Sequence, residues 1–317
     1  MSEEQEKVLD LLMSDETALE TAKEHFEVDE ESSDAFGPKL KIKASSVLYE
    51  PTGRTKFINF FNERSKRSRA RKFNRKLDAN PESFVIVSEG DSWFQYPIFL
   101  KDIIDHLNEY PDYAIRSFGY GADWLSNMVD QAEFINDIRY YEAKIFMLSG
   151  GGNDLLAGGK IKDILHPFSD SISDADGYFK QDKKKEVIDH IHGLYTQMFA
   201  RLNRLFPDLH ILCHGYDYAI PKEHSLIGDN KHRWLWEPMT ELAIPEGFRS
   251  EIVVILMDSF YEMLEKLKSE HKNIHIVDNR NEVAPNEWND ELHPKNYGFM
   301  KIAQNFHNVI EKIRQDL

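Results

Sequence analysis

The chain has 317 residues, a single cysteine (Cys213) and a formal net charge of −16. One thiol excludes an intramolecular disulfide framework and a cysteine-rich zinc site, and the negative charge argues against generic binding of duplex nucleic acid. The sequence has no apolar run of about 18 residues. The acidic start of the chain does not resemble a secretory signal, so we expect a cytoplasmic globular protein.

The charge is unevenly distributed along the chain. Residues 1–50 have a net charge of −9, residues 51–80 of +8 and residues 81–317 of −15. Apolar residues at helical spacing predict a helix from Glu3 to Glu27, with an acidic linker after it. We therefore expect residues 1–50 to form an acidic helical extension and linker. The alternative is that the acidic helix docks a protein partner.

A basic stretch follows this acidic head. Eight Lys and Arg residues lie between Arg64 and Lys76, and aromatic residues flank them. We expect residues 51–82 to form a basic helical segment that packs on, or leads into, the rest of the chain. The simplest prediction is a solvated helix on an acidic body. The alternative is contact with an anionic membrane or another polyanion through Arg64–Lys76.

From residue 83 onward, short β-rich runs alternate with helical segments. Strands are predicted over 83–88, 113–118, 144–149, 209–214 and 274–278, and helices over 97–108, 123–139, 184–206, 250–271 and 297–314. Apolar strands separated by helices predict βαβ units and a parallel sheet flanked by helices. Two long loops, 156–183 and 215–247, interrupt the alternation. We expect the first to be solvated and the second to border a binding site.

Polar and glycine-rich turns follow the predicted strands. They are Gly90-Asp91-Ser92-Trp93, Gly119-Tyr120-Gly121-Ala122-Asp123, Gly150-Gly151-Gly152-Asn153-Asp154 and, before the last helix, Asp290-Glu291-Leu292-His293-Pro294. Each turn taken alone is a common loop or cap. Ligands of an open parallel sheet bind beyond the carboxyl ends of its strands, so the fold would bring these turns together. They supply a serine, a histidine with a nearby carboxylate, and two loops of hydrogen-bond donors.

The four turns resemble the four motifs of the SGNH hydrolases, also called GDSL esterases/lipases. Gly90-Asp91-Ser92 is similar to the first motif, with Trp93 where many members have leucine. Gly121 is similar to the second, Gly151-x-Asn153-Asp154 to the third and Asp290-x-x-His293 to the fourth. We favour Gly121 over Gly119 because it lies next to the expected helix start. The resemblance covers residues 83–317, expected as the catalytic domain. It implies a three-layer, flavodoxin-like α/β fold of about five parallel strands.

The resemblance also implies a mechanism: hydrolysis of carboxylic esters through an acyl-enzyme. Ser92 would be the nucleophile, His293 its general base, and Asp290 the carboxylate that orients the imidazole. The backbone N–H groups of Ser92 and Gly121 and the side-chain amide of Asn153 would form the oxyanion hole. Asp91 and Asp154 would hold their loops through backbone N–H groups. No metal ion or organic cofactor is expected.

Aromatic side chains near these motifs are the candidate substrate contacts: Trp93, Tyr216, Trp234 and Trp236. Trp93 fits the core and the wall of an acyl pocket equally well, whereas the loop with Trp234 and Trp236 suits either an acyl chain or a sugar ring. The leading prediction is therefore an esterase or lipase that acts on a small-molecule or lipid ester, and a carbohydrate O-acetyl esterase is the alternative. The alternative from another class is an inactive relative that serves as a binding or regulatory module.

Overall fold

The computed structural model describes residues 24–28, 40–43, 46, 58–96, 100–121, 123–223 and 234–317. The strands are β1 (Phe26–Val28), β2 (Leu40–Ile42), β3 (Phe84–Gly90), β4 (Tyr113–Ser117), β5 (Ile145–Ser149), β6 (His210–His214) and β7 (Ile274–Val277). The longer helices are α3 (Ile58–Ala79), α9 (Gln181–Leu205), α11 (Glu246–Glu270) and α12 (Asn296–Asp316). The shorter ones are α4 (Ile103–Leu107), α5 (Leu125–Gln131), α6 (Phe134–Tyr140), α7 (Gly152–Leu156), α8 (Ile161–Ile164) and α10 (Trp236–Glu241).

The main sheet has five parallel strands in the order β4-β3-β5-β6-β7. Counted along the chain from β3, this is the order 2-1-3-4-5 of the flavodoxin-like fold. The predicted helix-flanked parallel sheet is therefore confirmed. Every residue of β5, the central strand, is buried, as expected when helices cover both faces of a sheet.

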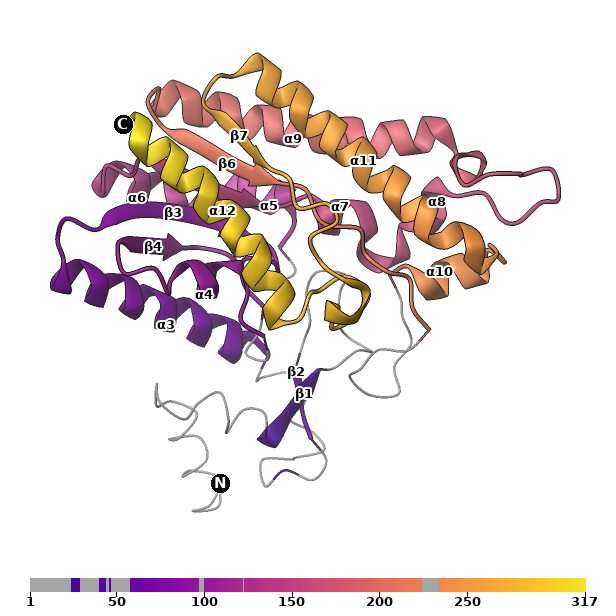
Figure 1. Cartoon of the computed structure of the whole chain (residues 1–317), viewed down its shortest axis with the longest axis horizontal. Coiled ribbons are helices and arrows are strands. Elements are labelled where there is room, and N and C mark those ends of the chain that lie inside the picture. Colours follow the sequence, from indigo (N-terminus) through magenta and orange to yellow (C-terminus); the bar gives the residue numbers. More distant parts are fainter. Residues whose placement is uncertain are drawn as a thin grey trace.

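Helices form a layer on each side of this sheet. α12 packs against α4, whereas α9 packs against α5 and α11. In Figure 1, α12 crosses the front of the sheet and α5 and α6 lie behind it. The core between the layers is apolar, with Ile86, Phe146 and Leu212 fully buried. In the described ranges, no helix is long and apolar enough to cross a bilayer.

The basic helix α3 lies along β4, at one edge of the sheet (Figure 1). Lys76 Nζ donates to the carbonyl of Tyr113 at 2.7 Å, and the Phe73 ring meets Tyr141 edge-on at 4.9 Å. Covering an edge strand in this way protects its unpaired backbone groups. The helix lies on the body as expected, and its inner face is buried, since Phe73 and Arg69 are only 1% and 8% exposed.

Several predicted boundaries need correction. Most of the expected helix 3–27 lies outside the described residues. Glu24 and His25 are helical, but Phe26 and Glu27 pair with Ile42 and Lys41 in an antiparallel β1–β2 ladder. Residues 97–99 of the helix expected over 97–108 are also outside the described ranges. α4 itself begins at Ile103 because the side chain of Asp102 caps it, accepting the N–H of Asp105 at 3.1 Å. The domain boundaries at residues 50 and 82 stay predictions.

The helix expected over 123–139 is two helices, α5 and α6. Ala132 closes α5 in the left-handed conformation, with φ of 44°, and its N–H bonds the carbonyl of Met128. The loop expected to be solvated over 156–183 is partly buried instead, since Ile161, Leu165 and Tyr178 have no exposed surface. These apolar side chains extend the core beneath α9.

Candidate active site

The serine lies in a single helical turn directly after β3. The N–H groups of Phe94 and Gln95 both donate to the carbonyl of Asp91, at 3.0 and 2.9 Å. The turn begins at Gly90, where a Cβ would lie 2.8 Å from the Cβ of Ser149 on β5. A side chain at Gly90 would therefore force the ends of β3 and β5 apart. Ser92 is in this way held at the carboxyl edge of the sheet.

The histidine and its carboxylate lie in the turn before α12. Asp290 Oδ1 accepts the backbone N–H of Leu292 and of His293, each at 2.8 Å, which folds the turn back on itself. Both carboxylate oxygens lie 2.9 Å from His293 Nδ1. On the other side of the ring, Nε2 lies 2.8 Å from Ser92 Oγ. The structure thus brings together the three side chains that the motifs singled out.

The electrostatics of this turn favour an ionised carboxylate. Burial alone would raise the pKa of Asp290, but the neighbouring His293 and the N–H donors of the turn outweigh it and lower that pKa. An ionised Asp290 accepts the Nδ1 proton of the imidazole, so Nε2 is the nitrogen that can accept a proton from Ser92. Ser92 and His293 have no exposed surface in this structure.

The two donor loops lie beside the serine turn. Gly151 starts the third motif with φ of 97°, a conformation that favours glycine, and α7 follows it. The Asn153 side-chain amide donates to the carbonyl of Asp123 at 2.7 Å, which fixes its plane. Gly121 is buried, but it lies in a loop four residues before α5 and not next to a helix. Asp123 delays the helix, because its side chain accepts the N–H of Trp124 at 2.9 Å.

A buried network beneath Ser92 joins two of these motifs. Asp91 accepts hydrogen bonds from the Tyr216 hydroxyl at 2.5 Å, Ser149 Oγ at 2.8 Å and the N–H of Trp93 at 3.1 Å. The Tyr216 hydroxyl in turn accepts the N–H of Gly152 at 3.1 Å. Tyr216 therefore supports the serine turn through these hydrogen bonds, and its expected contact with substrate stays a prediction. The sequence indicated only that Tyr216 follows β6 and so lies at the carboxyl edge of the sheet.

The other aromatic candidates differ in burial. Trp93 is fully buried, and its Nε1 donates to the carbonyl of Leu292 at 3.1 Å. It braces the histidine turn in this structure, and its contact with substrate stays a prediction. Trp236 is half-buried and packs against the guanidinium of Arg249, 4.1 Å from its ring centre. Half-buried Trp234 meets His293 edge-on at 6.1 Å and stays a candidate substrate contact.

The sequence pattern does not single out Glu291, which lies inside the Asp290–His293 motif. Its carboxylate is fully buried and accepts the N–H groups of Trp236 at 2.7 Å and Leu235 at 3.2 Å. Burial raises the pKa of Glu291 to about 8. The contact holds the segment of Trp234 beside the histidine. The sequence gives no sign of this contact, because the partners of Glu291, Leu235 and Trp236, lie more than 50 residues before it.

Asp154 joins motifs as well, because its Oδ2 accepts the N–H of Leu125 at 3.0 Å, at the start of α5. Asp154 was expected to hold its own loop, and this hydrogen bond shows that it also holds the start of the neighbouring helix α5. Cys213 is fully buried. Within the described ranges, no three His, Cys, Asp or Glu side chains converge as metal ligands would.

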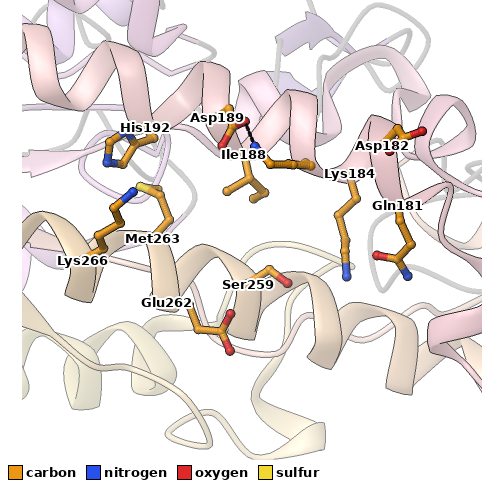
Figure 2. Close-up of a pocket in the computed structure, with 11 residues that line it drawn as sticks. Gln181, Asp182, Lys184, Ile188, Asp189, His192, Ser259, Glu262, Met263 and Lys266 are labelled. Carbon is orange, nitrogen blue, oxygen red and sulfur yellow. Dashed lines mark hydrogen bonds and ion pairs between the residues drawn. The ribbon is translucent and has the colours of Figure 1, made fainter.

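A second set of polar side chains lines a groove of about 510 Å³ between α9 and α11, the α9–α11 groove (Figure 2). Its lining includes Asp189 and His192 from α9 and Ser259 and Glu262 from α11. Ser259 Oγ donates to the carbonyl of Ile255 in its own helix at 2.8 Å, and Asp189 pairs with Lys185. In the described structure, His192 Nε2 has no hydrogen-bond partner. The groove therefore lacks a serine–histidine–carboxylate relay.

Comparisons with known proteins find similarity at the level of structure. No family model matches the sequence, and no curated protein matches it. The chain is similar to the lipase Lip_vut3 from a goat rumen metagenome (13% identity, TM-score 0.49, covering 71% of this chain and 97% of that one). It is also similar to an extracellular lipase from Streptomyces rimosus (12%, 0.48, 71% and 99%) and to a family 3 carbohydrate esterase from Clostridium thermocellum (13%, 0.43, 74% and 98%). The chemistry is therefore inferred from the side chains of this chain.

Proposed function

We propose that this protein is a serine-dependent hydrolase of carboxylic esters that works through an acyl-enzyme. One observation supports this above all: Ser92 Oγ, His293 and Asp290 form a continuous hydrogen-bonded relay, with steps of 2.8 and 2.9 Å. A serine hydroxyl is a weak nucleophile until an adjacent base takes its proton. The relay supplies such a base together with the carboxylate that orients it.

In the acylation step, Ser92 Oγ attacks the ester carbonyl carbon as its proton passes to His293 Nε2. Asp290 stabilises the imidazolium that forms. The tetrahedral intermediate then collapses, its C–O bond to the leaving alcohol breaks, and His293 returns the proton to that alcohol. The product of this step is an ester between the acyl group and Ser92.

In the deacylation step, water takes the place of the alcohol. His293 accepts a proton from the attacking water, the bond between the acyl carbon and Ser92 Oγ breaks, and the proton returns to the serine. A carboxylic acid leaves. Both steps develop negative charge on the carbonyl oxygen, and we assign its stabilisation to the backbone N–H groups of Ser92 and Gly121 and an N–H of Asn153. Each such donor contributes roughly 3 kcal/mol in comparable sites.

The four motifs also resemble those of the SGNH hydrolases, which supports the same chemistry. Two substrate classes fit this proposal. A lipid or simple acyl ester predicts activity that rises with chain length and is stimulated by micelles. A carbohydrate O-acetyl ester predicts preference for acetyl groups and indifference to micelles. Trp234, beside His293, suits either an acyl chain or a sugar ring.

The test uses purified full-length protein and p-nitrophenyl esters of increasing acyl length. We expect hydrolysis by the wild type and by a Ser259→Ala control, whose serine lies in the α9–α11 groove. Ser92→Ala should fold and lose activity. Robust hydrolysis by folded Ser92→Ala would refute the proposed mechanism.

A fluorophosphonate probe separates an enzyme from an inactive binding module. With an intact relay the probe should label Ser92, whereas an inactive relative would stay unlabelled.

Fewer side chains are available for the proposed polyanion contact through Arg64–Lys76 than the sequence suggested. Arg69 is buried in an ion pair, so the contact would use exposed side chains such as Arg67 and Arg71. Docking of a protein partner by the acidic head stays a proposal, and most of that segment lies outside the described residues.

A further inference from the structure

One cation of helix α3 points into the protein and not into solvent. Arg69 Nη2 lies 2.5 Å from Asp102 Oδ2 and 3.1 Å from Asp105 Oδ1, and Nη1 donates to the carbonyl of Phe94. Its side chain is 8% exposed, whereas Arg67, Arg71 and Arg75 of the same helix are exposed. Arg69 lies outside residues 83–317, to which the motif resemblance is confined. Yet its contacts reach the segment that follows Ser92.

The partners of Arg69 hold the chain just after the serine turn. Phe94 comes two residues after Ser92, and its carbonyl is an acceptor for the guanidinium. Asp102 is fully buried, and the oxygen that binds Arg69 also accepts the N–H of Tyr96 at 2.8 Å. The arginine and the aspartate together thus fix the backbone at Phe94 and Tyr96. A guanidinium presents donors in a planar fork, so it can bind a carbonyl and a carboxylate at once in fixed directions.

The same segment contacts the histidine. The ring of Tyr96 meets the imidazole of His293 at 4.9 Å between centroids, at an interplanar angle of 70°. The backbone that Arg69 holds therefore includes the end of the serine turn, at Phe94, and the residue whose ring packs against the imidazole, Tyr96. A shift of this segment would change the approach of Ser92 Oγ to Nε2. Small displacements of reacting groups reduce rates strongly, by as much as about a hundredfold for about 1 Å.

We propose that Arg69, supplied by the helix before the catalytic region, is a positioning residue that aligns Ser92 with His293. This inference rests on the proposed ester hydrolysis. A buried guanidinium–carboxylate pair is often no more stabilising than apolar side chains of similar volume. The bonds to Phe94 and, through Asp102, to Tyr96 give this pair a geometric role that apolar packing would not supply.

The experiment measures kcat and KM for p-nitrophenyl acetate, the rate of fluorophosphonate labelling, and thermal stability in full-length variants. Arg69→Met leaves the buried Asp102 unpaired and is expected to destabilise the protein. The double variant Arg69→Met/Asp102→Asn removes that unpaired charge, and Arg69→Lys keeps the charge but loses the fork. Arg75→Met, on the exposed face of α3, is the matched control.

We expect the double variant to be more stable than Arg69→Met, yet to lose about tenfold or more in kcat and in labelling rate with KM within about twofold. Arg69→Lys should fold and lose kcat, whereas Arg75→Met should match the wild type. A double variant with wild-type kcat would show that Arg69 only stabilises the fold and would overturn the inference alone. A wild type that neither hydrolyses the ester nor labels would overturn the proposed function and this inference with it.

Discussion

The carboxyl edge of the sheet and the α9–α11 groove contain the same kinds of functional groups in different arrangements. Each has a serine, a histidine and an aspartate. At the sheet edge, two separate turns, one with Ser92 and one with both Asp290 and His293, form a single relay. In the groove, Ser259 bonds its own helix and Asp189 bonds Lys185, on the same helix face (Figure 2). Residue types alone therefore do not make a catalytic site. The mutual orientation of the side chains does, and substitutions in both regions can test this contrast.

The largest contrast is expected between the two histidines. Replacing His293 by alanine removes the proposed general base, so kcat should fall by roughly 10⁶-fold, as for a histidine in a comparable relay. His192→Ala should leave kcat unchanged. Steady-state hydrolysis of p-nitrophenyl acetate measures both. A large loss in His192→Ala, with folding retained, would move the proposed chemistry to the groove.

The two aspartates should differ almost as much. Asp290→Asn keeps the shape of the turn but offers a neutral side chain to Nδ1, which permits the wrong tautomer of His293. We expect kcat to fall by roughly 10⁴-fold. Asp189→Asn in the groove should have no effect on kcat. If Asp290→Asn retained wild-type kcat, the proposed orienting role of this carboxylate would be wrong.

An oxyanion donor has a smaller effect than a relay member. Asn153→Ala should lower kcat by about 10²- to 10³-fold with little change in KM, because the proposed role of its N–H is to stabilise charge that develops in the transition state. Gln181→Ala, which removes an amide from the lining of the groove, is the control. A rise in KM with unchanged kcat in Asn153→Ala would indicate ordinary substrate binding instead.

Glu291 offers a test of stability rather than rate. Its pKa of about 8 in the folded protein lies above the ordinary value of 4.5, so the folded state binds more protons between these values. Stability should therefore fall as the pH rises through this range, by up to about 1.4 kcal/mol per pH unit. Glu291→Gln should reduce that slope in urea unfolding measured from pH 5 to 8. The exposed Glu262→Gln of the groove should not, and equal slopes in wild type and Glu291→Gln would contradict the assignment.

The smallest effect is expected at the surface ion pair of the groove. Lys185 and Asp189 are both exposed, so water screens their attraction and ordering the side chains offsets it. Lys185→Ala should leave the melting temperature and kcat unchanged. A clear drop in melting temperature would show that this pair stabilises α9 more than surface pairs usually do.

Much of the fold could be read from the apolar pattern of residues 83–317. All five predicted strands of the sheet exist within a residue or two of their expected ends, because a strand buried on both faces leaves a continuous apolar run. The ends of helices that depend on a single residue could not be predicted from this pattern. Asp102 delays α4, Asp123 precedes a late α5, and Ala132 ends α5 in a left-handed conformation. Each depends on one local hydrogen bond or dihedral angle that periodicity does not encode.

The candidate site divides in the same way. The sequence by itself determined that Ser92, Asn153, Asp290 and His293 follow strands or precede a helix at one edge of a parallel sheet, because chain order and strand direction fix that edge. Only the tertiary structure decided what supports them. Tyr216 bonds Asp91, Glu291 bonds the segment of Trp234, and Arg69 bonds the turn after the serine. These partners lie tens to more than a hundred residues apart, and hydrogen bonds between distant residues leave no periodic trace in the sequence.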